Sequence, residues 1–251
     1  MKSLEGTRAI VTGGSRGLGL GIAQALAAEK VHVVVVARDP ARLAAVAKEI
    51  GAETVAADIA DDAAAGRILR DARPDLVVLC AGAVPPSGSI HEQTWESFSR
   101  NWEVDAKSTF FWLRHILKMP LKPGSHVIVV SSGAAVRGSP ASGGYASAKR
   151  AQWFMAEYAA NESQREKLGL RVHCLLPNLN PSTELGRAGI ASYAQRAGVT
   201  PEEFAKRFGP PLTPAIMGRA VVELATDDSG AGGKWDQLAY RVTGAGLAPL
   251  G

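Results

Sequence analysis

The chain has 251 residues, of which 46% are hydrophobic and 21% charged, with a formal net charge of +4. This is ordinary globular usage, and the basic residues form no long run, so neither disorder nor nucleic-acid binding is indicated. Apolar stretches such as 31–37 are far shorter than the roughly 20 residues that cross a bilayer, so we expect no membrane span. At this length, one domain is the expected organisation.

The N-terminus and the cysteines both bear on where in the cell the protein is expected. The chain begins with one lysine and runs straight into a strand-like segment, without the apolar core of a signal peptide. Cys80 and Cys174 lie in apolar strand-like contexts, which favours buried thiols over a disulfide. We therefore expect a cytoplasmic protein, and no metal, because too few candidate ligands accompany the thiols.

Short β-branched runs alternate along the chain with longer segments of helical spacing. The runs predict strands at 8–12, 31–37, 54–57, 75–80, 126–131, 171–176 and 238–244. The segments between them predict helices at 17–29, 40–50, 61–71, 95–118, 143–167 and 214–226. Strands that are buried on both faces and joined by helices form a covered parallel sheet, so we expect an α/β fold with a doubly wound parallel sheet in three layers.

An insertion at about 178–213 interrupts this alternation with several prolines. Within it, Thr200 can cap a helix that has Pro201 at its first position and Glu203 at its third. Ligands of open α/β sheets bind outside the carboxyl ends of the strands, so the insertion is well placed to cover a substrate. The alternative is a structural excursion that packs beside the sheet.

A glycine-rich turn, TGGSRGLG at 12–19, lies between the first predicted strand and the first predicted helix. Gly13, Gly17 and Gly19 allow a tight turn and a close approach to a pyrophosphate, while the helix N-terminus offers free N–H groups. Ser15 and Leu18 complete the predicted cofactor-binding turn. We predict a dinucleotide site here, with a purely structural turn as the alternative.

The end of the second predicted strand favours NADP(H) over NAD(H). Enzymes that prefer NAD often carry an acidic residue there for the ribose 2′-hydroxyl. This strand ends at Ala37 and is followed by Arg38, and Arg16 of the glycine turn adds a second cation. Two arginines can engage a 2′-phosphate. Asp39 leaves NAD(H) possible, because its carboxylate can neutralise Arg38 instead.

Tyr145 and Lys149 stand four residues apart in GGYASAKR, and therefore share one face of a predicted helix. Such a pair is common by chance, so the spacing alone leaves an ordinary helix pair as the alternative. An ammonium nearby favours the phenolate and makes a tyrosine of pKa near 10 usable in proton transfer. Ser132 ends a predicted strand 13 residues earlier, where its hydroxyl can meet a ligand above the sheet or cap the following turn.

The glycine turn, Ser132, Tyr145 and Lys149 together resemble the short-chain dehydrogenase/reductase family, over nearly the whole chain. The resemblance implies a single Rossmann-type domain, with a dinucleotide-binding half at 1–120 and a catalytic and substrate half at 121–251. It also implies roles. The tyrosine gives or takes the proton, the lysine holds the nicotinamide ribose and lowers the tyrosine pKa, and the serine orients the substrate oxygen.

Further cofactor-binding positions follow from the same resemblance: Asp58, Ile59, Cys80, Ala81, Gly82, Pro177 and Thr183. Asp58 corresponds to the residue that meets the adenine, with a helix cap as the alternative. Ser182 or Thr183 supplies the hydroxyl for the nicotinamide amide.

Three residues depart from the family pattern. Cys80 stands in place of an asparagine, and Asn178 in place of a glycine. Asp105 replaces the asparagine that completes a proton relay to the lysine. An ionised Asp105 near Lys149 weakens the pull of that lysine on Tyr145, so we expect slower catalysis or a shifted pH profile.

We therefore expect an NADP(H)-dependent oxidoreductase that interconverts a ketone or aldehyde and an alcohol. The expected pocket walls are mostly small and apolar, and predict a small-molecule substrate of little charge. They are Val84, Pro85, Pro86, Ala134, Ala135, Val136, Leu185, Ile190 and Tyr193. A non-catalytic NADP(H)-binding sensor or scaffold remains the alternative, with an NAD(P)-dependent epimerase or dehydratase behind it. The helices at 95–118 and 143–167 carry extra apolar surface from Trp95, Phe98, Trp102, Trp112, Trp153 and Phe154. The resemblance implies assembly through these two helices, so we expect a homodimer or homotetramer, although core packing explains at least half of these residues.

Overall fold

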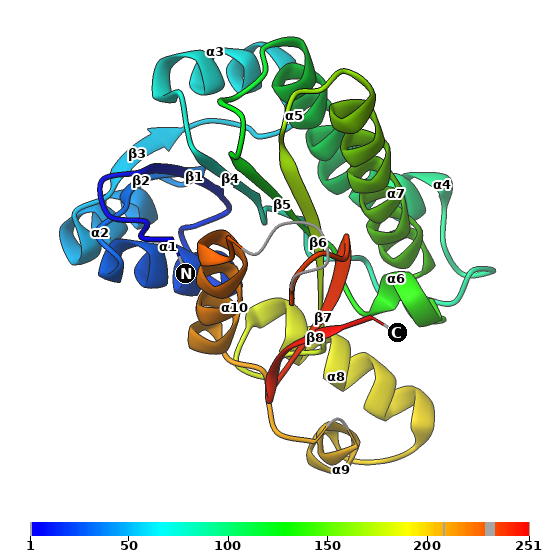
Figure 1. The fold of residues 1–251 in the computed structure, drawn as a ribbon. Coiled ribbons are helices and arrows are strands. Elements are labelled where there is room, and N and C mark those ends of the chain that lie inside the picture. The colour runs from blue at the N-terminus through cyan, green and yellow to red at the C-terminus, as the bar shows by residue number, and fades with distance from the viewer. Residues whose placement is uncertain (1, 208, 229–233, 251) are drawn as a thin grey trace.

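The computed structural model describes residues 2–207, 209–228 and 234–250. Figure 1 shows a central sheet with helices on both sides, which confirms the doubly wound α/β fold in three layers. The strands are β1 (Arg8–Thr12), β2 (His32–Ala37), β3 (Glu53–Ala56), β4 (Leu76–Leu79), β5 (His126–Val130), β6 (Arg171–Pro177), β7 (Ala239–Thr243) and β8 (Gly246–Pro249).

The strand order is β3-β2-β1-β4-β5-β6-β7-β8. Strands β1 to β7 pair in parallel, and β8 adds an antiparallel edge. Each predicted strand is present within one or two residues of its expected bounds. Strand β8 was not predicted, because its short segment between glycine and proline lacks a periodic apolar pattern.

Two helical layers cover the sheet, as Figure 1 shows. One layer contains α1 (Gly17–Ala28), α2 (Pro40–Ile50) and α10 (Pro214–Thr226), and the other contains α3 (Asp62–Ala72), α5 (Lys107–Lys118) and α7 (Gly143–Arg165). Strand β2 explains why both faces need cover. Val33 and Val35 enter the first core and Val34 and Val36 the second, so alternate side chains of one apolar run serve opposite layers.

The predicted helix at 95–118 has the expected extent but contains a change of helical type. It consists of α4 (Trp95–Asn101), a π-helical turn η1 (Trp102–Ala106) and then α5. Thr94 caps its start by accepting from the backbone N–H of Ser97 at 3.2 Å. A π-turn inserted in an α-helix often marks a functional position.

The insertion after β6 folds into α8 (Glu184–Ala197) and α9 (Pro201–Lys206). The predicted helix start is confirmed: Thr200 and Glu203 form a reciprocal capping box, with Pro201 at the first helical position. A further short helix, α6 (Ala134–Arg137), follows β5 and was not predicted because a single turn carries no periodicity.

Among the described residues, no helix is long and apolar enough to span a membrane, and no group of three potential ligands is placed to hold a metal ion. Cys80 and Cys174 are both free thiols.

The start of β5 generates a prediction about stability. His126 is 6% exposed and stacks on His173 of β6. Burial, with the charge of His173, lowers the pKa of His126 to about 3. An unfolded imidazole has a pKa of about 6.5. The contribution of His126 to the free energy of unfolding is therefore fully present above that pH, and it is lost as the pH falls toward 3.

We expect His126 to add a slope of up to about 1.4 kcal/mol per pH unit to the free energy of unfolding in this window. Urea unfolding of the wild type and of His126→Gln, between about pH 7 and pH 4, measures the difference in slope. Equal slopes for the two proteins would contradict the assignment.

Candidate active site

A cleft of about 1140 Å³ lies at the carboxyl ends of the strands. Its wall contains each residue that the sequence assigned to catalysis or cofactor binding. These are Gly13, Ser15, Arg16, Gly17, Leu18, Gly19, Arg38, Asp58, Ile59, Cys80, Ala81, Gly82, Asp105, Ser132, Tyr145, Lys149, Pro177 and Thr183. Segments up to 170 residues apart in the chain therefore meet in one space, as the convergence of parallel strand ends requires.

The glycine turn forms the floor of the cleft. Gly13 has a φ of 70°, and a Cβ on it would come within 2.7 Å of the Cα of Ala81, so only glycine fits between β1 and the loop after β4. Helix α1 starts at Gly17 with no side-chain cap and no acidic residue in its first turn. Its first N–H groups are thus free of protein side-chain acceptors, and this arrangement fits a diphosphate.

The charged residues beside this turn are partly engaged. Asp39 caps α2 by accepting from the backbone of Ala41 and Arg42, and its carboxylate pairs with the guanidinium of Arg42 at 3.2 Å. It therefore does not neutralise Arg38, which makes no ion pair within the described part of the chain. Arg16 pairs with Glu184 at the start of α8.

The adenine end contains Asp58 and Ile59. Asp58 accepts a hydrogen bond from the N–H of Ala60 at 2.9 Å and so forms a local turn, while the cap of α3 is Asp61. The alternative role of Asp58 as a helix cap is therefore wrong, because Asp61 caps α3. Ile59 is buried, and its carbonyl accepts from the indole of Trp112 at 3.1 Å.

Helix α7 carries Tyr145 and Lys149 along one face, and Ser132 approaches from the end of β5. Ser132 is close enough to the phenol of Tyr145 to lower its pKa, and its hydroxyl accepts from the N–H of Ala134 at 3.2 Å. The preceding Ser131 instead donates to the carbonyl of Lys149 at 2.7 Å. Ser131 thereby joins β5 to α7, and Ser132 is the serine that faces the tyrosine.

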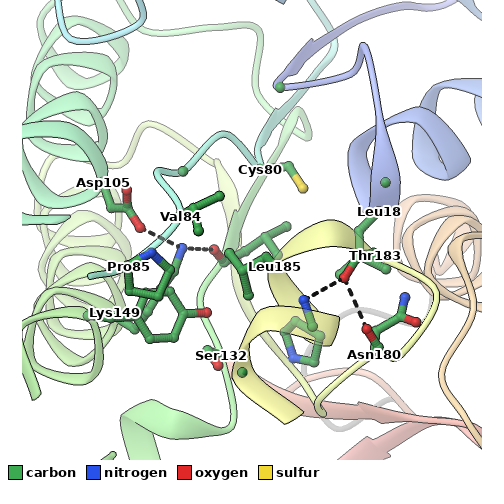
Figure 2. Close-up of a pocket in the computed structure, with 18 of the residues that line it drawn as sticks. Leu18, Cys80, Val84, Pro85, Asp105, Ser132, Lys149, Asn180, Thr183 and Leu185 are labelled. Carbon is green, nitrogen blue, oxygen red and sulfur yellow. Dashed lines mark hydrogen bonds and ion pairs between the residues drawn. The ribbon is translucent and has the colours of Figure 1, made fainter. Parts of the chain in front are cut away.

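The most distinctive contact is a buried ion pair between Asp105 of η1 and Lys149 of α7 (Figure 2). The ammonium Nζ lies 3.3 Å from Oδ2 of Asp105, whose side chain has no exposed surface. The carboxylate also accepts from the N–H of Ala83 at 2.8 Å. A Cβ on Gly82 would come within 3.0 Å of Oδ2, so glycine at this position leaves room for the carboxylate.

This pair changes the acid–base properties of the site. Burial raises the pKa of Tyr145; Lys149 opposes that shift, and Asp105 adds to it. Burial lowers the pKa of Lys149, but the combined attraction of Asp105, Tyr145 and Cys80 outweighs burial and leaves the pKa above its usual value. The expected lowering of the tyrosine pKa by the lysine is therefore smaller than the opposing effects, and the phenol is held in its neutral form.

Two buried amides that the sequence analysis missed surround Asp105. Asn101 donates to Oδ2 of Asp105 at 3.3 Å and to the carbonyl of Ala83 at 2.9 Å. Gln152 donates to the backbone carbonyl of Asp105 at 3.1 Å. The four-residue spacing of Asn101 and Asp105 was the only available signal, and it does not distinguish a buried pair from an exposed one.

The segment after β6 contributes hydroxyl groups that already form hydrogen bonds within the protein. Thr183 caps α8 by accepting from Gly186 N–H at 3.0 Å, and it donates to the carbonyl of Asn180 at 3.0 Å (Figure 2). Ser182 donates to Oδ1 of Asn180 at 2.7 Å. A hydroxyl oxygen has two lone pairs, so Thr183 keeps one to accept from an amide N–H of a ligand.

The apolar wall agrees only in part with the expected one. The cleft is lined by Val84, Pro85, Ala134, Val136, Leu185 and Tyr193. Ala135 and Ile190 are buried in the protein instead, and Pro86 lies outside the lining.

Comparison with known proteins decides the family. The model of the short chain dehydrogenase family matches residues 7–188. The chain belongs to this family. It is accordingly an NAD(P)-dependent oxidoreductase.

Several relatives of this short-chain dehydrogenase have curated names. 2,3-Dihydro-2,3-dihydroxybenzoate dehydrogenase of Bacillus subtilis is 34% identical over 163 residues, which cover 60% of this chain and 61% of that protein. L-Fucose dehydrogenase of Oryctolagus cuniculus is 29% identical over 88% of this chain and 79% of its own length. (+)-cis,trans-Nepetalactol synthase NEPS1 of Nepeta racemosa is 26% identical over 91% of this chain and 87% of its own.

The buried ion pair generates a prediction for this dehydrogenase. Asp105→Asn removes a charge that raises the pKa of Tyr145 and keeps one acceptor oxygen, which can serve the N–H of Ala83. We expect carbonyl reduction, if it is the reaction, to be preserved or increased, and the pKa of Tyr145 to fall. The pH profile of kcat/KM measures both, with circular dichroism as the control for folding. A hundredfold fall in kcat with unchanged folding would rule the prediction out.

Cys80 generates a second prediction. Burial, opposed by the charge of Lys149, raises its pKa to about 11. Because the thiolate is the reactive form, we expect iodoacetamide at about pH 8 to modify Cys80 on the order of a hundredfold more slowly than an ordinary thiol. Mass spectrometry of Cys174→Ser, which leaves Cys80 as the single cysteine, gives the rate. A rate equal to that of free glutathione would refute the assignment.

Proposed function

We propose that the protein is an NADP(H)-dependent reductase or dehydrogenase that interconverts a ketone or aldehyde and an alcohol, with Tyr145 as the acid/base. The observation that carries this proposal is the meeting of Ser132, Tyr145 and Lys149 in the cleft that also contains the uncapped start of α1. A dinucleotide on that helix end places its other end toward the three side chains, along one continuous space.

The bound cofactor supplies or accepts the hydride, and the protein handles position and the proton. Ser132 donates a hydrogen bond to the carbonyl oxygen of the substrate. Tyr145 delivers its phenolic proton to that oxygen in reduction, and removes it from the alcohol in oxidation. Lys149, at the back of the cleft, stabilises negative charge on the phenol oxygen and can donate to a cofactor hydroxyl.

The preference for NADP(H) rests on Arg38. Its guanidinium lines the cleft at the end of β2 and makes no ion pair among the described residues, while its neighbour Asp39 is bound to Arg42 and the start of α2. A 2′-phosphate therefore meets an uncompensated cation at this point. Arg16 joins that contact if it leaves Glu184.

One observation favours a second candidate, a non-catalytic NADP(H)-binding sensor. The charge of Lys149 is already balanced by Asp105, and the pKa of Tyr145 is raised, so the phenol is a weaker proton carrier than the sequence motif alone suggests. A binding protein has no requirement for an ionisable phenol. The catalytic proposal remains the better one because Ser132 and Tyr145 face each other within the cleft.

We also propose a homodimer or homotetramer in the cytoplasm. Of the aromatic residues that suggested assembly, Trp112 belongs to the core, with 1% of its surface exposed. From the same set, Trp95, Trp102 and Phe154 are exposed on α4, η1 and α7, and the structure adds Phe110 of α5 and Tyr158 of α7. An exposed aromatic surface on neighbouring helices fits an interface between copies. Two free thiols fit the reducing conditions of the cytoplasm.

A cofactor titration followed by a carbonyl panel tests the proposed function. Fluorescence titration should show NADPH binding more tightly than NADH, and Arg38→Ala should reduce that difference by about tenfold. Aldehydes and ketones are then tested for NADPH oxidation with wild type and Tyr145→Phe. The expected result is turnover that falls at least about a hundredfold in Tyr145→Phe, because the proton donor is lost. Tight NADPH binding with no Tyr145-dependent turnover across the panel would support the sensor instead.

A further inference from the structure

The acidic side chains that line the cleft are all engaged by the protein. They are Asp39, Asp58, Asp105 and Glu184. Asp39 pairs with Arg42, Asp105 pairs with Lys149, and Glu184 pairs with Arg16. Asp58 accepts from the backbone N–H of Ala60. No carboxylate of the described lining is thus left to neutralise further positive charge.

The same lining contains cations with no such partner. Beyond Arg38 at the end of β2, these are Arg137 at the end of α6, Arg207 directly after α9 and Arg241 in β7. Within the described residues, none of these three side chains forms an ion pair or a hydrogen bond. Hydrogen bonds from Thr200 lower the pKa of Glu203, and Arg207 adds to that lowering through space. The guanidinium of Arg207 also lies over the ring of Phe204 at 5.4 Å, but its N–H groups stay available.

These three arginines belong to the substrate side of the cleft. The sheet order places β5, β6 and β7 on the opposite side of β1 from β2 and β3, where the adenosine half of a dinucleotide lies in this fold. Arg137 follows β5, Arg241 is in β7, and Arg207 follows the segment inserted after β6. Arg38 at β2 serves a 2′-phosphate, but the other three are too far along the sheet order to share that task.

Contacts made by α8 and α9 of the inserted segment link the parts of the chain that carry Arg137 and Arg207. Tyr193 of α8 hydrogen-bonds to Ser139, two residues after Arg137. The Tyr193 ring also stacks on Phe204, with centroids 5.6 Å apart and planes 5° apart, and Phe204 in turn lies under Arg207. Arg137 and Arg207 are therefore connected through Ser139, Tyr193 and Phe204.

We propose that the substrate is a carbonyl compound, or its alcohol, that carries an anionic group such as a carboxylate, which Arg137 and Arg207 bind. The inference rests on the proposed function, since it places the reacting oxygen at Tyr145. A cleft with one sign of uncompensated charge concentrates ligands of the opposite sign, and a planar guanidinium matches a carboxylate even where, as at Arg137 and Arg207, the side chain is exposed. Apolar walls such as Val84, Pro85 and Leu185 then contact the carbon frame between the two polar ends. This proposal differs from the substrate of little charge that the apolar walls alone predict.

Two aldehydes of matched shape test this inference: 4-formylbenzoate, an anion, and its neutral methyl ester. We expect wild type to show a kcat/KM for the acid at least about tenfold above that for the ester, with NADPH as reductant. The ratio should fall toward one in the double variant Arg137→Gln with Arg207→Gln. Lys206→Gln is the matched control, because Lys206 is exposed in α9 and does not line the cleft. It removes one positive charge, as each of the two arginine substitutions does, and should leave the ratio intact.

The outcomes separate this inference from the proposed function. If both aldehydes react in a Tyr145-dependent way but the ester is equal or better, the anionic substrate is wrong and the catalytic function stands. If neither aldehyde reacts, calorimetry of benzoate and benzamide with the NADP⁺-loaded protein decides. Benzoate binding that is tighter by about tenfold and is lost in the double variant supports the anion site. Equal binding of the two probes overturns it.

Discussion

Parallel pairing of seven strands is the constraint on which the rest of this structure depends. Because every one of these strands runs in the same direction, their carboxyl ends share one edge of the sheet. The glycine turn after β1, Cys80 after β4, Ser132 after β5 and Pro177 at the end of β6 are thereby brought to one cleft. Parallel pairing also requires crossover helices on both faces, and α7, which carries Tyr145 and Lys149, is one of them.

At the centre of that cleft, the Asp105–Lys149 pair must balance a large loss of hydration. A buried ammonium alone is strongly disfavoured, and the pair is stable only when its remaining hydrogen-bonding groups are satisfied. Ala83 and Asn101 donate to the carboxylate, and the carbonyl of Val130 accepts from Lys149 at 3.4 Å. The local geometry exists because η1 directs Asp105 inward and Gly82 leaves space for it.

Most of the fold could be predicted because the central strands are apolar on both faces and the helices have clear spacing. The π-turn could not, because one shifted turn of hydrogen bonds barely alters the hydrophobic period of 95–118. Likewise, Asn101 and Gln152 look like ordinary helical amides in sequence, and only packing shows that both are 1% exposed. Motif spacing brought Ser132, Tyr145 and Lys149 into one hypothesis, but their mutual electrostatics depend on burial, which spacing does not reveal.

The arrangement of charge along the cleft follows from the same burial. Since Asp105 pairs with Lys149, the positive side chains of the described lining that have no acidic partner are arginines, not this lysine. These arginines come from four separate segments of the chain, so no basic run in the sequence predicts them. They are Arg38 on one side of the sheet order and Arg137, Arg207 and Arg241 on the other. In the proposed hydride transfer, the neutral centre formed by the Asp105–Lys149 pair leaves the polarisation of the reacting oxygen to Ser132 and Tyr145. The proposed anion contacts at the ends of the cleft then position the two reactants through groups that are remote from the reacting carbon.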